Sequence, residues 1–122
     1  MKKAGPCVVV AVLLVCVMSG AGAAAQKNVT PGVPGNLTLV IVQNGFRLSW
    51  TPSADDPGVV TGYEIVRADL ASGPFVTVGT VANGVFHYVD TTAAPEVIYY
   101  YKVRAMTGNV HSPDSNTVVG ER

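Results

Sequence analysis

Short stretches in which apolar and polar residues alternate recur along most of the chain, and Gly, Pro, Asn and Asp separate them. Alternation with a period of two is typical of β-strands that bury one face. In the longest such stretch, residues 99–106, Tyr99, Tyr101, Val103 and Ala105 fall on one face. We expect seven strands, at residues 37–42, 46–50, 63–67, 75–81, 86–89, 99–106 and 117–119.

Turn signals lie between these stretches, and no window has the period of a helix. Asn44-Gly45 and Asn83-Gly84 are strong hairpin signals, and residues 51–62 contain two prolines and two glycines. Val, Thr and Tyr dominate the remaining positions, which favours strands. Seven short strands with turns at this spacing, in about 90 residues, predict an all-β, immunoglobulin-like sandwich of two sheets.

Residues 1–25 have a different pattern. A basic start at Lys2 and Lys3 is followed by an unbroken apolar run of twelve residues and then by small residues that end at Ala25. This three-part pattern is typical of a secretory signal peptide, and we expect cleavage after Ala25. The apolar run is shorter than the roughly 20 residues needed to span a bilayer. An uncleaved anchor is the alternative, because no charge lies between Lys3 and Lys27.

Both cysteines, Cys7 and Cys16, lie in this leader. A lipoprotein is a further alternative, but Val15 before Cys16, inside the apolar run, is a poor match for a lipidation site. Cleavage leaves a mature chain without cysteine. We therefore expect an exported domain that depends on packing alone, without disulfide bonds.

The mature chain divides into three parts. We expect a flexible tether at residues 26–33, the domain at residues 34–119 and a short C-terminal tail at residues 120–122. Removing Lys2 and Lys3 leaves six of the eight basic residues against eight acidic ones, a net charge of −2. A slightly acidic domain with dispersed basic residues lacks the surface that binds nucleic acid or anionic membranes. We expect a monomer without nucleic acid, and membrane contact only through an uncleaved leader.

From Pro34 to Val119 the chain resembles the fibronectin type III family. The matching segments are Pro34 with Leu37 and residues 48–52, 62–65, 99–105 and 115–118. Five segments in this order and at this spacing are specific. The resemblance implies a seven-stranded sandwich of that kind, and the missing Cys pair favours it over an immunoglobulin domain proper.

The resemblance also gives two aromatic residues a defined place. Trp50 is expected at the core centre, as the most buried large side chain. Tyr99 is in position for a tyrosine corner, with its hydroxyl bonded to a backbone group between Ala94 and Val97. Arg67 departs from the pattern, since by parity it falls on the buried face of its strand. We expect it to extend to the sheet edge.

No residue pattern indicates a catalytic, cofactor or metal site. His87 and His111 lack the spacing of zinc ligands. Asp55 and Asp56 are interpreted as turn residues, because a Ca²⁺ ion takes about six to eight oxygens and no other acidic residue is near. Asp90, before two threonines, is interpreted as a strand-ending turn. No nucleophile elbow is present, and a small filled sandwich is not expected to hold a pocket of several hundred Å³.

We therefore expect a non-catalytic interaction or adhesion module, secreted or in the cell envelope, that binds a protein or a carbohydrate. By the resemblance, the loops at residues 52–61 and 107–114 lie at one end and would carry the binding. They contain no Arg-Gly-Asp triplet. A small exported hydrolase and a structural spacer without a ligand are the alternatives. Asn28 and Asn36 begin glycosylation sequons, which apply only in a eukaryotic source.

Overall fold

The computed structural model describes residues 29–122, so the predicted leader, its cleavage site and the Asn28 sequon lie outside the described residues. The regular structure consists of β1 (Gly35–Val42), β2 (Gly45–Thr51), β3 (Gly62–Ala68), β4 (Val76–Ala82), β5 (His87–Asp90), β6 (Tyr99–Thr107), β7 (Val110–His111) and β8 (Val118–Gly120). Every strand except β7 begins and ends within two residues of an expected strand. Within residues 29–122, no helix has the length and apolar character needed to cross a membrane.

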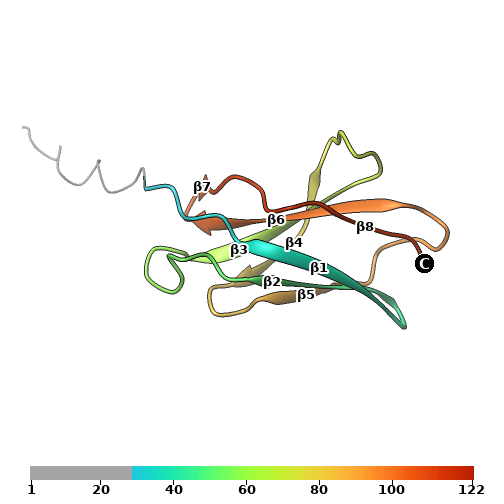
Figure 1. Cartoon of the computed structure of the whole chain (residues 1–122), viewed down its shortest axis with the longest axis horizontal. Coiled ribbons are helices and arrows are strands. Elements are labelled where there is room, and N and C mark those ends of the chain that lie inside the picture. The colour runs from blue at the N-terminus through green and yellow to red at the C-terminus, as the bar shows by residue number, and fades with distance from the viewer. Residues whose placement is uncertain (1–28) are drawn as a thin grey trace, which may run out of the picture.

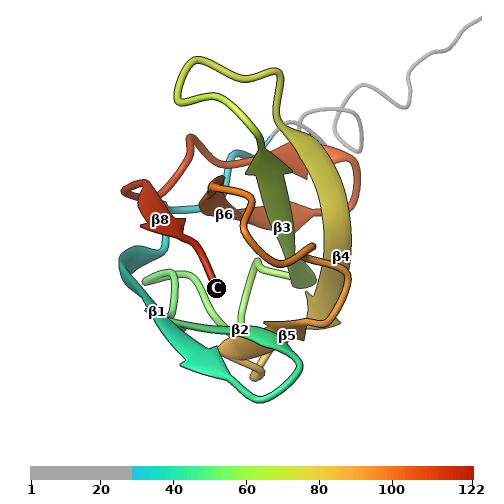
Figure 2. The same cartoon turned by 90° about the vertical axis from the view of Figure 1, so that its right-hand side faces the viewer.

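The strands form two antiparallel sheets that face each other (Figure 1). One sheet has the order β1-β2-β5; the other has the order β4-β3-β6-β7, with β8 also paired to β6. Figure 2, seen along the long axis, shows β1, β2 and β5 in one layer and β3, β4, β6 and β8 in the other. The predicted all-β sandwich of two sheets is confirmed.

The expected seventh strand at residues 117–119 is β8, and the structure adds a two-residue strand, β7, in the preceding loop; both pair with β6. Between them the chain leaves the ladder around Pro113, which has no N–H to donate. The hydroxyl oxygens of Ser112 and Ser115 accept hydrogen bonds from the β6 N–H groups of Ala105 and Val103, both at 2.9 Å. Serine side chains replace strand carbonyls in this stretch, so β7 and β8 cover the edge of β6 as two separate strands.

The side chains that were expected to face inward meet between the sheets. The most completely buried large residues include Phe46, Tyr63 and Tyr101, each 0% exposed, whereas Trp50 is 6% exposed. Trp50 belongs to the core, but the prediction that it is the most buried large side chain is wrong. The reason is its position, since β2 ends at Thr51 and Trp50 lies beside the strand end rather than at its middle.

Tyr99 forms the predicted tyrosine corner. Its hydroxyl accepts a hydrogen bond from the N–H of Ala94 at 3.1 Å, within the expected segment. Tyr100, the next residue, lies on the outer face of the sheet and is partly exposed. The predicted register of β6 is therefore confirmed.

The packed domain extends beyond both expected boundaries. Pro31 is buried, and the N–H of Gly32 donates to Asp55 Oδ2 at 2.8 Å. Part of the expected tether therefore packs on the domain, because the Asp55 carboxylate supplies an acceptor. At the other end, β8 includes the first residue of the expected tail, and Arg122 Nη2 donates to the carbonyl of Ala93 at 2.7 Å. The expected tail thus holds the loop between β5 and β6.

Asn116 connects the approach to β8 with the free edge of β1. Its Oδ1 accepts a hydrogen bond from the N–H of Leu37 at 2.8 Å, and its Nδ2 donates to the carbonyl of Leu37 at 3.0 Å. One side-chain amide therefore satisfies both backbone groups of an edge residue, as a neighbouring strand would.

Candidate functional site

The two loops that were expected to carry binding do lie together at one end of the sandwich. The hydroxyl of Thr107 donates to the carbonyl of Val59 at 3.1 Å, and the hydroxyl of Thr61 donates to the carbonyl of Met106 at 3.1 Å. These bonds tie residues 52–61 to the β6–β7 connection. The expected placement at one end is confirmed, and the hydroxyls of Thr61 and Thr107 hold the two loops to each other.

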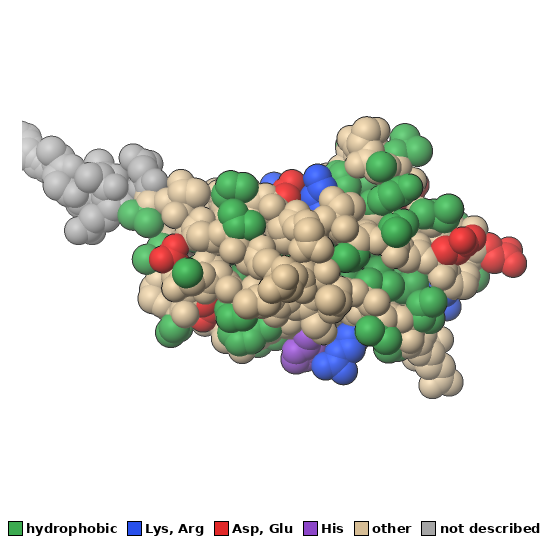
Figure 3. All heavy atoms as spheres, viewed as in Figure 1, with side chains coloured by type: hydrophobic (Ala, Val, Ile, Leu, Met, Phe, Trp, Pro, Cys, Tyr) green, Lys and Arg blue, Asp and Glu red, His purple; other side chains and the backbone are tan. Residues whose placement is uncertain are grey.

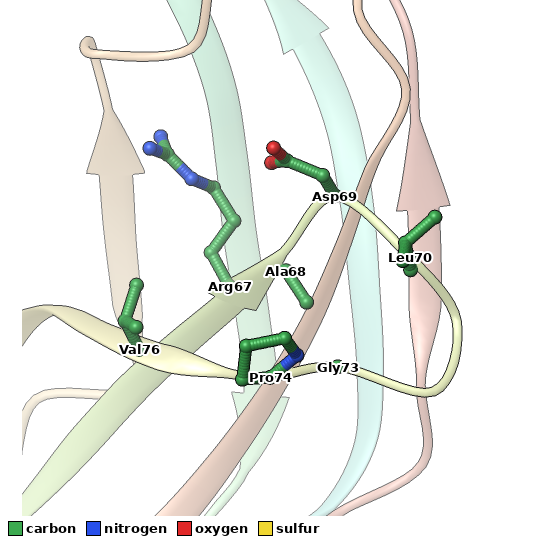
Figure 4. A pocket seen from close by; sticks show the side chains of 7 residues that line it. All are labelled: Arg67, Ala68, Asp69, Leu70, Gly73, Pro74 and Val76. Carbon is green, nitrogen blue, oxygen red and sulfur yellow. The ribbon is translucent and has the colours of Figure 1, made fainter.

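The opposite end has an open hollow of about 290 Å³ on the loop that joins β3 to β4 (Figure 4). Its lining residues are Arg67, Ala68, Asp69, Leu70, Gly73, Pro74 and Val76. The hollow lies outside the filled core, on a loop where the period-two pattern ends. Sequence reasoning missed it for that reason. Figure 4 shows the side chains of Arg67 and Asp69 extending to the same side of the loop.

Two groups hold the guanidinium of Arg67: Asp90, the last residue of β5 in the opposite sheet, and Thr92, in the loop after β5. Its Nη1 donates to Asp90 Oδ2 and to Thr92 Oγ1, both at 2.9 Å. Its guanidinium lies over the ring of Tyr99, 4.5 Å from the centroid, which is a cation–π geometry. Burial lowers the pKa of Arg67, but the hydrogen bond and the charge of Asp90 raise it overall. The cation is therefore held near the end of β3, which has a neighbouring strand on each side, so the expectation that it extends to the sheet edge is wrong; a buried partner from the opposite sheet holds it instead.

Asp90 is the buried counterpart of this cation, with 1% of its surface exposed. Its Oδ2 also accepts a hydrogen bond from the hydroxyl of Tyr101 at 2.6 Å, and its Oδ1 accepts the N–H of Thr92 at 2.9 Å. Burial raises the pKa of Asp90, but the hydrogen bonds from Tyr101, Thr92 and Arg67 lower it overall. The Asp90–Thr92 bond confirms the predicted turn. The pairing with Arg67 was not predicted, since the two residues are 23 positions apart and lie in different sheets.

Asp55 and Asp56 serve the loop at the far end, as the turn interpretation predicts. The carbonyl of Asp55 accepts the N–H of Val59 at 2.9 Å. Asp56 Oδ2 accepts the hydroxyl of Tyr63 at 2.8 Å and the N–H of Gly84 at 3.2 Å. Burial and the hydrogen bond to Asp56 together raise the pKa of Tyr63 to about 12.

The two histidines lie on the outer faces of different sheets. His87 is exposed on β5, and His111 Nε2 lies 3.2 Å from Glu64 Oε1. The same oxygen accepts a hydrogen bond from Arg104 Nε at 2.6 Å. Burial raises the pKa of Glu64, but the hydrogen bonds from Thr77 and Arg104 lower it overall. Across residues 29–122, no three His, Cys, Asp or Glu residues gather in a group that could hold a metal ion.

Comparison with known proteins agrees with this architecture. The model of the fibronectin type III domain matches residues 32–121. An amylopullulanase of Thermoanaerobacter thermohydrosulfuricus is 39% identical over 89 residues, which are 73% of this chain and 6% of that protein. Protein sidekick-1 of Mus musculus is 37% identical over 84 residues, which are 66% of this chain and 4% of that protein. The chain thus spans only a small part of these curated relatives.

Among solved structures, the crystal structure of a Fn3-like protein from Clostridium thermocellum has a TM-score of 0.63 and 26% identity. The match covers 73% of this chain and 90% of that protein's chain. The family model covers most of the chain, and the same two-sheet fold recurs in this solved structure. The chain therefore belongs to the fibronectin type III family.

Proposed function

We propose that the chain is a non-catalytic accessory module of an exported protein that binds or processes a polysaccharide. The observation that carries the proposal is the 39% identity to a segment that makes up 6% of an amylopullulanase. Amylopullulanases of Thermoanaerobacterium thermosulfurigenes and Thermoanaerobacterium saccharolyticum are each 41% identical over 71 residues. The segment is a small part of a much larger protein in all three cases, as an accessory module would be.

The chemistry of the described residues supports binding rather than catalysis. The hollow at the β3–β4 loop offers a guanidinium, a carboxylate and apolar side chains, and its lining contains no Ser, Thr, Cys or His. Glycoside hydrolysis uses a pair of Asp or Glu side chains, one on each side of the bond that is cleaved, whereas this lining contains the single carboxylate of Asp69. On the face shown in Figure 3, charged side chains are few and dispersed, which supports recognition by shape and hydrogen bonds rather than by a strong field.

Affinity electrophoresis of the purified chain tests this proposal. Native gels that contain amylopectin, pullulan or soluble cellulose derivatives should retard the chain when it binds the polymer, and a gel without polymer is the control. We expect retardation by an α-glucan and no release of reducing sugar from any polymer. Release of reducing sugar would overturn the non-catalytic assignment. Equal mobility in every gel would favour a spacer without a ligand.

Export is the second part of the proposal, and the basic, apolar and small-residue pattern of the first 25 residues supports it. The intact mass of the protein recovered outside the cytoplasm should correspond to a chain that starts at Gln26, within a few residues. A full-length species that stays with the membrane fraction would favour an anchored module at the cell surface instead.

A protein ligand is the second candidate, and the outer face of the three-stranded sheet favours it. Val40 and Val89 lie on either side of Arg47 in one row across β1, β2 and β5. They are 58% and 40% exposed, so an apolar contact on this face would bury both. A pull-down from extracellular extract with the wild-type chain and with a Val40→Ser variant tests it, since a partner on this face should be lost from the variant.

A further inference from the structure

We propose that the hollow at the β3–β4 loop binds a neutral sugar unit through two adjacent hydroxyl groups. The inference rests on the proposed function and gives it a site and a ligand class. It differs from the expectation drawn from the sequence, which placed binding in loops 52–61 and 107–114 at the other end.

The first part of the site is a fixed set of donors. Arg67 donates hydrogen bonds from Nη1 to Asp90 and to Thr92. The planar guanidinium carries further N–H donors on Nη2 and Nε. Because Asp90 and the ring of Tyr99 hold the group in one position, a ligand that accepts from these donors need not order a mobile side chain.

The second part is an acceptor that faces the same space. Asp69 is exposed, lines the hollow and extends to the same side of the loop as Arg67 (Figure 4). Within residues 29–122, its carboxylate forms no ion pair closer than 4 Å. A carboxylate accepts only, and a guanidinium donates only. A ligand that binds both groups must donate a hydrogen bond to Asp69 and accept one from Arg67. Two neighbouring hydroxyl groups of a sugar can do this.

The third part is an apolar wall. Leu70 and Val76 are 62% and 57% exposed although both are aliphatic, and Pro74 lies between them in the lining. The C–H face of a sugar ring can cover such side chains, which removes their apolar surface from water. The volume of about 290 Å³ is near the lower end of ligand sites, which run from about 300 to 1,000 Å³. It suits one or two sugar rings rather than a long chain.

The local charge selects against an acidic sugar. Asp69 and Asp90 carry two negative charges near the hollow, and Arg67 supplies the positive charge that pairs with Asp90. The net charge of these three groups is negative, and the unpaired negative charge among them is that of the exposed Asp69. The carboxylate of a uronic acid would be repelled by Asp69, whereas a neutral sugar would not.

The test is a titration of the ¹⁵N-labelled chain followed by amide chemical shifts. Maltotriose is the probe, cellotriose tests the linkage, and a galacturonic acid trimer tests the charge. We expect maltotriose to shift amides of residues 67–76 with a dissociation constant on the order of millimolar, as befits a small open site. Asp69→Asn should weaken the binding about tenfold, because it removes a hydrogen bond to a charged group. Leu70→Ala should weaken it as well.

Asp55→Asn is the matched control, because Asp55 lies on the loop at the opposite end, where its Oδ2 accepts the N–H of Gly32, a bond that an amide oxygen can also accept. It should leave the affinity unchanged, and the amide spectrum of each variant reports whether it is folded. Tighter binding of the galacturonic acid trimer would overturn the ligand class. Shifts confined to residues 52–61 would overturn the site. An absence of shifts with every sugar, together with retardation in polysaccharide gels, would overturn the site while the proposed function stands; failure of both assays would overturn both.

Discussion

Replacement of Tyr101 by Phe removes a single hydroxyl from the buried side of the Arg67–Asp90 pair. That hydroxyl is inaccessible to solvent and donates to Asp90 Oδ2 at 2.6 Å. The ring keeps its packing against Phe46, 5.9 Å away between centroids. The loss is therefore one hydrogen bond to a charged group, which is worth about 1.5–3 kcal/mol. Asp90 keeps its bonds to Arg67 and Thr92, so we do not expect loss of the fold.

The same variant has a defined pH dependence. The hydrogen bonds to Asp90 hold its folded pKa below that of the unfolded chain, so its stabilisation is present above about pH 4 and is lost as the pH falls through the folded pKa. Without the Tyr101 hydroxyl, the folded pKa of Asp90 rises toward its ordinary value. The difference in stability between the wild-type chain and Tyr101→Phe should therefore be largest near neutral pH and should shrink in acid.

Urea unfolding at pH 7 and at pH 3 measures both effects. Tyr100→Phe is the control, since it makes the same chemical change one residue away on the outer face, where the effect should stay within about 0.5 kcal/mol. Equal losses for the two variants at pH 7 would refute the assignment of Tyr101 as a buried partner of the carboxylate. A difference that grows in acid would refute the reasoning about the charge of Asp90.

Three further predictions concern other tyrosines and one strained residue. Tyr99→Phe should cost about 1 kcal/mol in denaturant unfolding, because it leaves the part-buried N–H of Ala94 without its acceptor; a loss no larger than that of Tyr100→Phe would contradict this. Glu96 has a φ of 65°, and Glu96→Gly should raise the midpoint of unfolding by an amount equivalent to about 1 kcal/mol, because glycine carries no penalty there. A lowered midpoint would show that no strain is relieved. The raised pKa of Tyr63, about 12, predicts that stability is complete below about pH 10 and falls as the pH rises toward 12. Tyr63→Phe should flatten that fall in alkaline unfolding curves, and an unchanged slope would contradict the assignment.

The sequence predicts which residues form strands and which face of each strand is buried, because both follow from alternation with a period of two. Tyr99 and Tyr101 alternate with Tyr100 and Lys102, and that alternation alone gives the faces of β6 correctly. The extra strand β7 could not be read in this way, because it is only two residues long and is followed by a stretch in which Ser112 and Ser115 act through side-chain oxygens that replace strand carbonyls. Trp50 was placed correctly in the core, but how deeply it is buried depends on where β2 ends. Alternation predicts the buried face of a strand more accurately than it predicts the residue at which the strand ends.

The candidate site was predicted only in fragments. The parity of Arg67 indicates a cation on the buried face, and Asp90 was recognised as a turn residue, but nothing in the linear pattern brings the two together. Their contact depends on how one sheet lies across the other. Asp69 and Leu70 follow the end of β3, where side-chain direction depends on loop dihedrals rather than on alternation. A signal for the site did exist, because a charged residue at a buried strand position requires a partner.

Asn116 has a consequence for how the molecule behaves in crowded solution. An edge strand with free backbone groups is a template on which a second chain can add, and such addition leads to aggregates. The Asn116 amide occupies both backbone groups of Leu37, on the open side of β1. In concentrated solution, copies of the chain meet often enough for such addition to matter. The single amide closes part of that edge without adding a charge, so the protection does not weaken in salt.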